Sequence, residues 1–259
     1  MVIKQIIKYL LLGLVQGFTE PLPISSSAHL VIASHYLGLE INLNTEILLH
    51  FASFWALVWF FRKDLFKMAK SILKPQKYPD EFKTVLNLSL ASLPIIILGF
   101  LFKKTIETYL NSVMTVCLFL LLTSVILVFT SFLIDQEKKL ASTSSDSLII
   151  GFFQSLAIFP GVSRSASTLL GAKVCKLKTK QALNFSFYLY LIASFGAFVL
   201  AVKDYSWSNF SVYDFLTIVV AFVSTLWGIS FLHRIISKRS LLFFSFYTIV
   251  ISVLVFLTK

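Results

Sequence analysis

QGFTEPLPISSSAH, residues 16–29, interrupts the first long apolar stretch of the chain, which runs from residue 4 to residue 38. Each of its prolines, Pro21 and Pro23, lacks a backbone N–H donor and disfavours helical geometry at the residue before it. The stretch is therefore expected to form two short half-helices joined by a bend. Such a pair of half-helices is a helical hairpin.

A second apolar stretch, residues 148–174, is broken in the same way by Pro160 and Gly161. Neither interrupted stretch is well suited to cross a membrane as one continuous helix. Both are predicted to be re-entrant hairpins, which enter and leave the membrane on the same side.

The rest of the sequence has the composition of a membrane protein. Of 259 residues, 57% are hydrophobic and 14% are charged, with a mean hydropathy of +0.85. Soluble domains carry about 25% charged residues. The formal net charge is +11, but the basic residues form short runs between apolar segments. Because no solvated basic face is large enough to bind DNA or RNA, we expect a membrane as partner and no nucleic acid.

Six further stretches are long enough to cross a bilayer core of about 30 Å, which takes about 17 to 25 helical residues. They are residues 45–61, 85–102, 110–134, 182–202, 215–232 and 241–258. The predicted fold class is an all-α integral membrane protein with six transmembrane helices and two re-entrant helical hairpins.

Basic connecting segments indicate which ends of the spans face the cytoplasm. Residues 62–83 carry seven Lys or Arg, residues 173–180 carry four Lys, and residues 234–240 carry three basic side chains. With these segments inside, residues 38–46 and 203–214 face outward, and the Ser-rich linker 135–147 faces inward. The first hairpin then enters from the outside and the second from the cytoplasm, although Lys4 and Lys8 are left on the outer side.

The two halves of the chain would thus have opposite orientations, which predicts an inverted-topology repeat within one membrane domain, residues 1–259. The first repeat, 1–134, combines hairpin 4–38 with three spans, and the second, 148–259, combines hairpin 148–174 with three spans. The sequence supports the repeat at an offset of 138 residues. At that offset, Gly13, Gln16, Ser25, Ser27 and Ala28 recur as Gly151, Gln154, Ser163, Ser165 and Ala166.

The bend of the first hairpin carries ionisable and hydroxyl groups. Gln16 and Glu20 are one helical turn apart and share a face. A carboxylate inside a membrane segment costs about 2.5 to 3.5 kcal/mol on the insertion scale, so Glu20 is a functional candidate. The following serines, Ser25, Ser26 and Ser27, can cap the next half-helix, and the N-terminus of a helix binds anions.

The second bend repeats this construction with Arg164 at the position of Ser26. A guanidinium group forks onto phosphate oxygens. In an inverted repeat both bends meet near the membrane midplane, so the combined groups predict phosphoryl transfer. Ser26 attacks, His29 or Glu20 handles the proton, and Arg164 stabilises the charged oxygens.

Two roles stay open at this stage. Glu20 is also a candidate ligand for Mg²⁺ or Ca²⁺, because these cations prefer oxygen ligands and bridge phosphates. The nucleophile is open between Ser26 and His29. The other histidines, His35, His50 and His233, have no converging partners in the sequence and are expected to be structural.

At these residues the chain resembles the undecaprenyl-diphosphate phosphatases, bacterial membrane enzymes associated with bacitracin resistance. Residues 16–20 resemble the family's Glu/Gln-x-x-x-Glu element, and residues 23–29, PISSSAH, resemble Pro-(Ile/Val)-Ser-Ser-(Ser/Thr)-Gly-His. Residues 160–165, PGVSRS, resemble Pro-Gly-x-Ser-Arg-Ser. The likeness extends over almost the whole chain. In the departures from the pattern, Ala28 and Ala166 stand where the family usually has Gly, and Pro21 stands where Phe is common.

The resemblance implies dephosphorylation of undecaprenyl diphosphate to the monophosphate carrier lipid, with a divalent cation such as Mg²⁺ or Ca²⁺. It also implies a site that opens to the outer face of the bacterial cytoplasmic membrane. The catalytic positions carried over are Glu20, Ser26, His29 and Arg164. The supporting, substrate-binding positions are Gln16, Ser25, Ser27, Ser163, Ser165 and Thr168. The oligomeric state is left open, a homodimer included.

Two alternatives were weighed against a phosphatase of this family. A transporter or flippase of an anionic polyprenyl phosphate lipid would also use an inverted repeat with broken helices. A carrier needs no nucleophile with a base, however, so the pair Ser26 and His29 beside Glu20 favours the enzyme. The acid-phosphatase-like lipid phosphatases have a histidine six residues after the arginine of a Ser-Arg pair, where this chain has Leu170.

Overall fold

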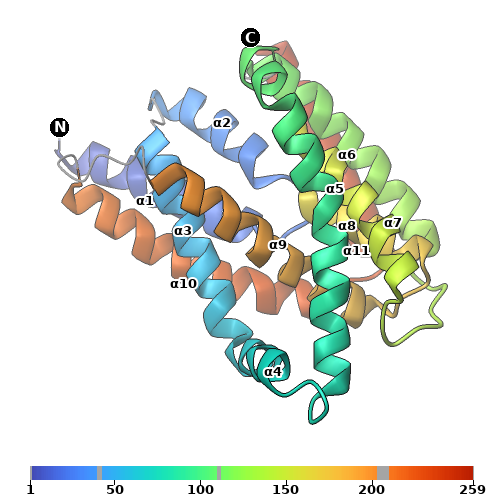
Figure 1. Cartoon of the computed structure of the whole chain (residues 1–259). Coiled ribbons are helices and arrows are strands. Elements are labelled where there is room, and N and C mark those ends of the chain that lie inside the picture. The colour runs from blue at the N-terminus through green and yellow to red at the C-terminus, as the bar shows by residue number, and fades with distance from the viewer. Residues whose placement is uncertain (1, 40–42, 110–111, 203–209, 259) are drawn as a thin grey trace.

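The computed structural model describes residues 2–39, 43–109, 112–202 and 210–258. These residues form eleven α-helices and one short 3₁₀ helix (Figure 1). In chain order the helices are α1 (Val2–Thr19), α2 (Ser26–Leu37), α3 (Leu43–Phe60), α4 (Arg62–Leu73), α5 (Pro79–Tyr109), α6 (Val113–Leu133), α7 (Ser144–Ser155), η1 (Leu156–Ile158), α8 (Arg164–Val174), α9 (Thr179–Ala201), α10 (Val212–Ile235) and α11 (Lys238–Leu257).

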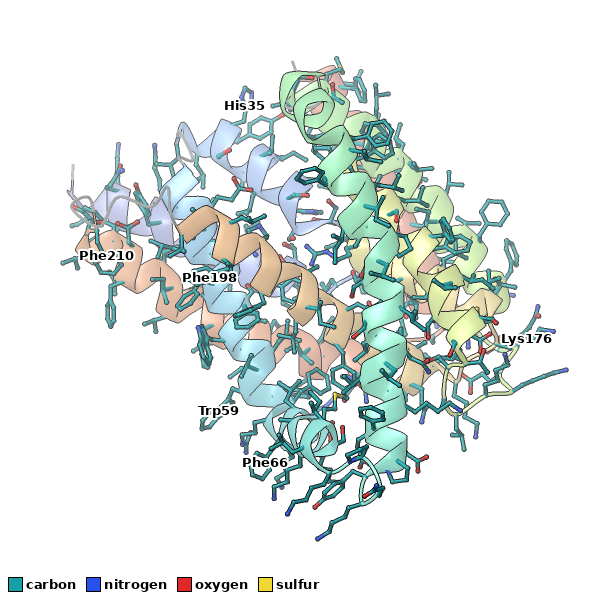
Figure 2. All side chains as sticks on the ribbon, viewed as in Figure 1. His35, Trp59, Phe66, Lys176, Phe198 and Phe210 are labelled. Carbon is teal, nitrogen blue, oxygen red and sulfur yellow. The ribbon has the colours of Figure 1, made fainter. Side chains whose placement is uncertain are left out.

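Within the described ranges, five helical segments are long and apolar enough to cross a membrane. They are Pro79–Phe102, Val113–Leu133, Thr179–Leu200, Val212–Ile235 and Lys238–Leu257. Helix α3 adds a shorter apolar segment, Thr45–Phe60. Large apolar side chains point outward, among them Trp59 and Phe66, which are 58% and 62% exposed (Figure 2). Outward-facing apolar surface of this kind suits lipid, so the predicted all-α, multi-pass membrane fold class is confirmed.

Several predicted boundaries were wrong. Residues 62–83 were treated as a connecting segment, but they contain helix α4 and the first turn of α5, which begins at Pro79 and is 31 residues long. Acidic residues in that first turn favour the helix N-terminus. The linker 135–147 ends early, because Thr143 forms a capping box with Asp146 and starts α7 at Ser144.

Some sequence predictions fall partly on residues outside the described ranges. They concern segments 38–46 and 203–214, which were predicted to face outward and which include residues 40–42 and 203–209, and the start of the predicted span 110–134.

Two pairs of short helices lie on opposite sides of the molecule with their bends directed toward its centre (Figure 1). Helices α1 and α2 form the first hairpin, and α7, η1 and α8 form the second. Helix α1 packs along α10, and α7 packs along α5. Each hairpin therefore packs against a long helix from the other half of the chain.

Glycines permit both of these close helix contacts. A Cβ atom on Gly13 would lie 2.7 Å from the carbonyl oxygen of Thr217 on α10. A Cβ atom on Gly151 would lie 2.4 Å from the carbonyl oxygen of Ala91 on α5. Both distances are far below van der Waals contact, so any larger residue would push the helices apart. Small residues serve this purpose at helix contacts in membrane proteins.

Candidate active site

The first bend, residues 20–25, joins α1 to α2. Ser25 is the N-cap residue of α2, and its hydroxyl accepts a hydrogen bond from the backbone N–H of Ala28 at 3.4 Å. The φ angle of Ser25 is 69°, in the left-handed region that side-chain-bearing residues rarely adopt. The Ser25 side chain therefore satisfies a free N–H group of α2, while the backbone of Ser25 itself is strained.

The second bend, residues 159–163, ends in the same type of cap. The Ser163 hydroxyl accepts from the N–H of Ala166 at 3.3 Å. Thr123 of α6 holds this bend, because its hydroxyl donates to the Gly161 carbonyl at 2.9 Å and accepts from the Ser163 N–H at 2.9 Å. Gly161 has φ 103°, and an added Cβ would lie 2.3 Å from the carbonyl oxygen of Val116. Only glycine fits there.

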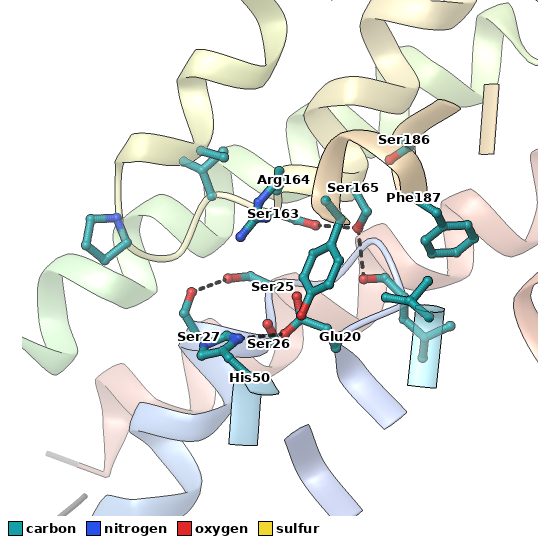
Figure 3. Close-up of a pocket in the computed structure, with 16 residues that line it drawn as sticks. Glu20, Ser25, Ser26, Ser27, His50, Ser163, Arg164, Ser165, Ser186 and Phe187 are labelled. Carbon is teal, nitrogen blue, oxygen red and sulfur yellow. Dashed lines mark hydrogen bonds and ion pairs between the residues drawn. The ribbon is translucent and has the colours of Figure 1, made fainter. Parts of the chain in front are cut away.

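The two bends meet. The Ser165 hydroxyl donates to the carbonyl of Leu22 at 3.1 Å, across 143 residues of sequence. Between the bends lies a cavity of about 230 Å³, which α3 and α9 also line (Figure 3). Seven of the ten predicted site residues line it: Glu20, Ser25, Ser26, Ser27, Ser163, Arg164 and Ser165.

Glu20 is held from two sides. Its Oε2 atom accepts a hydrogen bond from the Gln16 side-chain amide at 2.7 Å and lies 3.4 Å from Nδ1 of His50. Figure 3 shows the Ser26 side chain beside the same carboxylate. Gln16 is fully buried behind Glu20, and it also contacts His50 and Ser53. Gln16 therefore orients the carboxylate from outside the cavity wall.

Arg164 faces the first bend across the cavity. It is the first residue of α8, and its guanidinium lies 4.9 Å from the centre of the Tyr190 ring. It also donates to the Ser194 hydroxyl at 3.4 Å. Among the described residues, no carboxylate lies within salt-bridge distance of Arg164. Its charge is therefore available to an anion in the cavity.

Known proteins are similar to this chain over almost its whole length. The family model described as bacitracin resistance protein BacA matches residues 9–254. The chain is 36% identical to undecaprenyl-diphosphatase 2 of Bacillus thuringiensis, with 96% of each chain covered. It is 35% identical to undecaprenyl-diphosphatase 1 of Halalkalibacterium halodurans (93% and 92% covered) and 34% identical to undecaprenyl-diphosphatase of Thermosipho africanus (96% and 98%). The chain belongs to the BacA family. The resemblance that the three motifs predicted is thereby confirmed.

In this BacA family member, three of the predicted site residues, Gln16, His29 and Thr168, do not line the cavity. His29 Nδ1 is 2.7 Å from the carbonyl oxygen of Ser25, and its Nε2 is 3.0 Å from the hydroxyl of Tyr247. The two rings stack, with centroids 5.6 Å apart. Thr168 donates to the Arg164 carbonyl at 2.9 Å and contacts the Ser186 hydroxyl. Both residues support the walls of the cavity from behind.

His50 is a site residue that the sequence analysis missed. It was expected to have no converging partner, but it lines the cavity and contacts Glu20. The expectation was wrong because α3 packs against α1, which brings His50 to Glu20 across 30 positions of sequence. An ionisable residue inside a predicted span was the available signal, and the same criterion had identified Glu20.

Charged groups anchor the second hairpin at its far end, away from the cavity. Lys173, at the end of α8, is fully buried and donates to the Leu177 carbonyl at 3.0 Å. Lys139 donates to both carboxylate oxygens of Asp146 at 2.9 Å. Burial would raise the pKa of Asp146, but hydrogen bonds from Lys139 and Thr143 outweigh burial, so the pKa is below its ordinary value. Lys173 also donates to the carboxylate of Glu137 at 3.4 Å, which joins the end of α8 to the linker before α7.

Proposed function

We propose that this BacA family protein dephosphorylates undecaprenyl diphosphate to undecaprenyl phosphate at the cavity between the two bends. The protein is a membrane phosphatase of the undecaprenyl-diphosphatase type, as the names of its relatives indicate. One observation carries the assignment of the site. A hydroxyl with a carboxylate beside it, Ser26 with Glu20, shares one cavity with the guanidinium of Arg164, which has no carboxylate partner among the described residues. The reaction returns a carrier lipid for cell-wall synthesis and accounts for bacitracin resistance.

The first chemical step is attack by the Ser26 hydroxyl on the terminal phosphorus of the diphosphate. Glu20 takes the hydroxyl proton, the bond from that phosphorus to the bridging oxygen breaks, and undecaprenyl phosphate leaves. Arg164 binds the oxygens of the transferred group. The N-termini of α2 and α8 both border the cavity, where their free N–H groups favour an anion. Glu20 passes its proton to the departing undecaprenyl phosphate and is a carboxylate again. It then takes a proton from the water molecule that attacks the phosphoserine, the bond between phosphorus and Ser26 Oγ breaks, Ser26 recovers the proton from Glu20, and inorganic phosphate leaves.

We infer that Ser26, and not His29, receives the phosphoryl group. Both ring nitrogens of His29 have hydrogen-bond partners in the protein, and the ring lies outside the cavity wall. Ser26 lies in the wall beside a base. His29 is then a positioning residue that supports the strained bend through the Ser25 carbonyl. His50 and Gln16 position the carboxylate of Glu20.

A divalent cation, Mg²⁺ or Ca²⁺, fits the donor set of this cavity. Glu20 and the neighbouring hydroxyls offer only oxygen donors on the cavity side. No cluster of three or more His, Cys, Asp or Glu side chains occurs in the part of the chain that the structure describes. Glu20 would therefore hold the cation together with diphosphate oxygens, which is common for Mg²⁺. When bound, the cation would neutralise charge on the diphosphate.

The membrane arrangement is part of the same proposal. Six spans and two re-entrant hairpins form one domain, as an inverted repeat of residues 1–134 and 148–259. The matched glycines, Gly13 and Gly151, and the matched caps, Ser25 and Ser163, support this repeat. Basic segments support a cavity that opens to the outer face of the bacterial cytoplasmic membrane. A cysteine at Gln76 should accordingly react only after permeabilisation, and labelling of intact cells would reverse the orientation.

The activity is tested by inorganic phosphate release from undecaprenyl diphosphate, using the purified protein in detergent. Wild-type protein should release phosphate, a chelator should reduce the rate, and Arg164→Ala should abolish release while the protein stays folded. The names of the relatives do not favour a flippase. If well-folded wild-type protein releases no phosphate, the phosphatase proposal fails and lipid transport in vesicles becomes the next measurement.

A further inference from the structure

A second, mostly apolar cavity of about 280 Å³ lies between α3 and α9, next to the candidate active site. We call it the α3–α9 groove. Its apolar wall consists of Ile47, Phe51, Phe54, Ala197 and Phe198. Its polar lining consists of Glu46, His50, Arg164 and Ser194. Helices α3 and α9 lie side by side here (Figure 1).

The groove adjoins the site cavity, because His50 and Arg164 line both. A molecule that reaches from one cavity into the other therefore passes these two polar side chains. On one side it meets serine hydroxyls and the carboxylate of Glu20, and on the other it meets aromatic rings. Such a polarity change matches a ligand with an anionic head joined directly to an apolar chain.

On the α9 side the groove reaches the surface of the molecule. The rings of Phe51 and Phe198 stack across it with centroids 4.9 Å apart, and Phe198 lies where α9 runs beside α3 (Figure 2). On α9, Ala197, which lines the groove, is exposed. The small side chain of Ala197 thus leaves this side of the groove uncovered.

Two larger cavities, of about 1140 and 530 Å³, do not have these properties. Both are lined by Asp64 together with other charged side chains, and neither includes Arg164. They would suit water and ions better than a hydrocarbon chain. Among these cavities, the α3–α9 groove is the apolar one that joins the site.

We propose that the α3–α9 groove binds the isoprenoid chain of the lipid diphosphate, starting with the units next to the diphosphate. This inference rests on the proposed function. Arg164 then stands at the junction between head and chain. The groove positions the terminal phosphate against Ser26 by holding the chain, and the remainder of the chain lies along α9 in the membrane.

Photocrosslinking tests the proposal directly. The probe is a polyprenyl diphosphate with a diazirine in the first isoprene units, added to the wild-type protein, and the labelled peptides are mapped by mass spectrometry. We expect label on residues 47–54 of α3 and 194–198 of α9. Ala197→Phe fills the groove and should remove most of this label. Gly196→Phe is the matched control, because its side chain extends into open space beside the groove, and it should leave the label unchanged.

Kinetics provide the second measurement. Ala197→Phe should raise the KM for undecaprenyl diphosphate about tenfold, whereas Gly196→Phe should leave it nearly unchanged. Label on other helices, or label that Ala197→Phe does not reduce, would overturn the groove assignment even if phosphate release is normal. Crosslinking needs no turnover. Label in the groove without phosphate release would therefore retain the groove and refute the phosphatase.

Discussion

The two bends that meet at the cavity share one construction but differ in how they are held. In the second hairpin, α8 is buried from Ala166 to Lys173, and Thr123 hydrogen-bonds to the bend on both sides of Val162. In the first hairpin, the buried residues of α2 are only Ala28, His29 and Leu30, and the cap residue has a strained backbone. The comparison shows a rigid bend facing a strained one.

This difference matches the groups that each bend carries. The rigid bend presents a permanent positive charge, Arg164, whose use in binding depends on a constant position. The strained bend presents Ser26 and Glu20, the groups expected to form and break bonds. Backbone strain is commonly found at reacting groups. We therefore propose that the second hairpin supplies a fixed binding element and the first supplies the chemistry.

The largest expected effect separates two residues of the strained bend. Ser26→Ala should lower the rate of phosphate release about a thousandfold or more, because the nucleophile is lost. His29→Gln should lower the rate of phosphate release only about tenfold, because this substitution weakens the contact that supports the Ser25 carbonyl. Single-turnover phosphate release measures both, with thermal unfolding as the control for folding. The opposite ranking would make His29 the nucleophile.

The next effect concerns the charge on the rigid bend. Arg164→Lys should lower kcat/KM about a hundredfold, because lysine offers a point charge where arginine offers a planar fork for two phosphate oxygens. The unfolding temperature should change little, since Arg164 has no carboxylate partner in the described residues. Near-normal turnover in Arg164→Lys would show that only the charge matters.

A matched pair of glutamines sharpens the comparison further. Gln16 contacts Glu20, whereas Gln154, 138 residues later, donates to the carbonyl of Ala91 at 3.4 Å. Gln16→Ala should lower kcat about tenfold by freeing the carboxylate. Gln154→Ala should leave kcat unchanged and lower the free energy of unfolding by about 1 kcal/mol. Equal losses of activity in the two variants would contradict the division between the hairpins.

The smallest expected effect is acid destabilisation of the second hairpin. The pKa of Asp146 is lower in the folded protein than its ordinary value of 3.8. Its contribution to stability is therefore complete above that ordinary value and is lost as pH falls through the lower, folded value. Between pH 7 and pH 3 the unfolding temperature of wild type should fall about 2 °C more than that of Asp146→Asn. Parallel curves would remove Asp146 as an anchor.

Local signals explain what the sequence could predict. The prolines and the capping serines act over only a few residues of sequence. The sequence itself could therefore predict both bends, their capping residues and the position of Arg164. Helix α4 was not predicted because a segment rich in basic residues is typical of a loop. In the structure, its lysines lie on one side of an amphipathic helix.

Contacts between distant helices explain what the sequence could not predict. The partner of Glu20 on α3, His50, lies 30 positions away, and only the packing of α3 against α1 brings them together. The same holds for His29, which was expected in the site. The packing of α2 near α11 instead turns its ring toward Tyr247.

The central claim is that the two bends act on one substrate in one site. A double-mutant cycle tests it most directly, with kcat/KM measured for wild type, Glu20→Gln, Arg164→Lys and the double variant. Residues that act together on one transition state give non-additive losses. We predict that the double variant loses much less than the product of the two single losses. Losses that simply multiply would show that the two bends act independently, and would contradict the account.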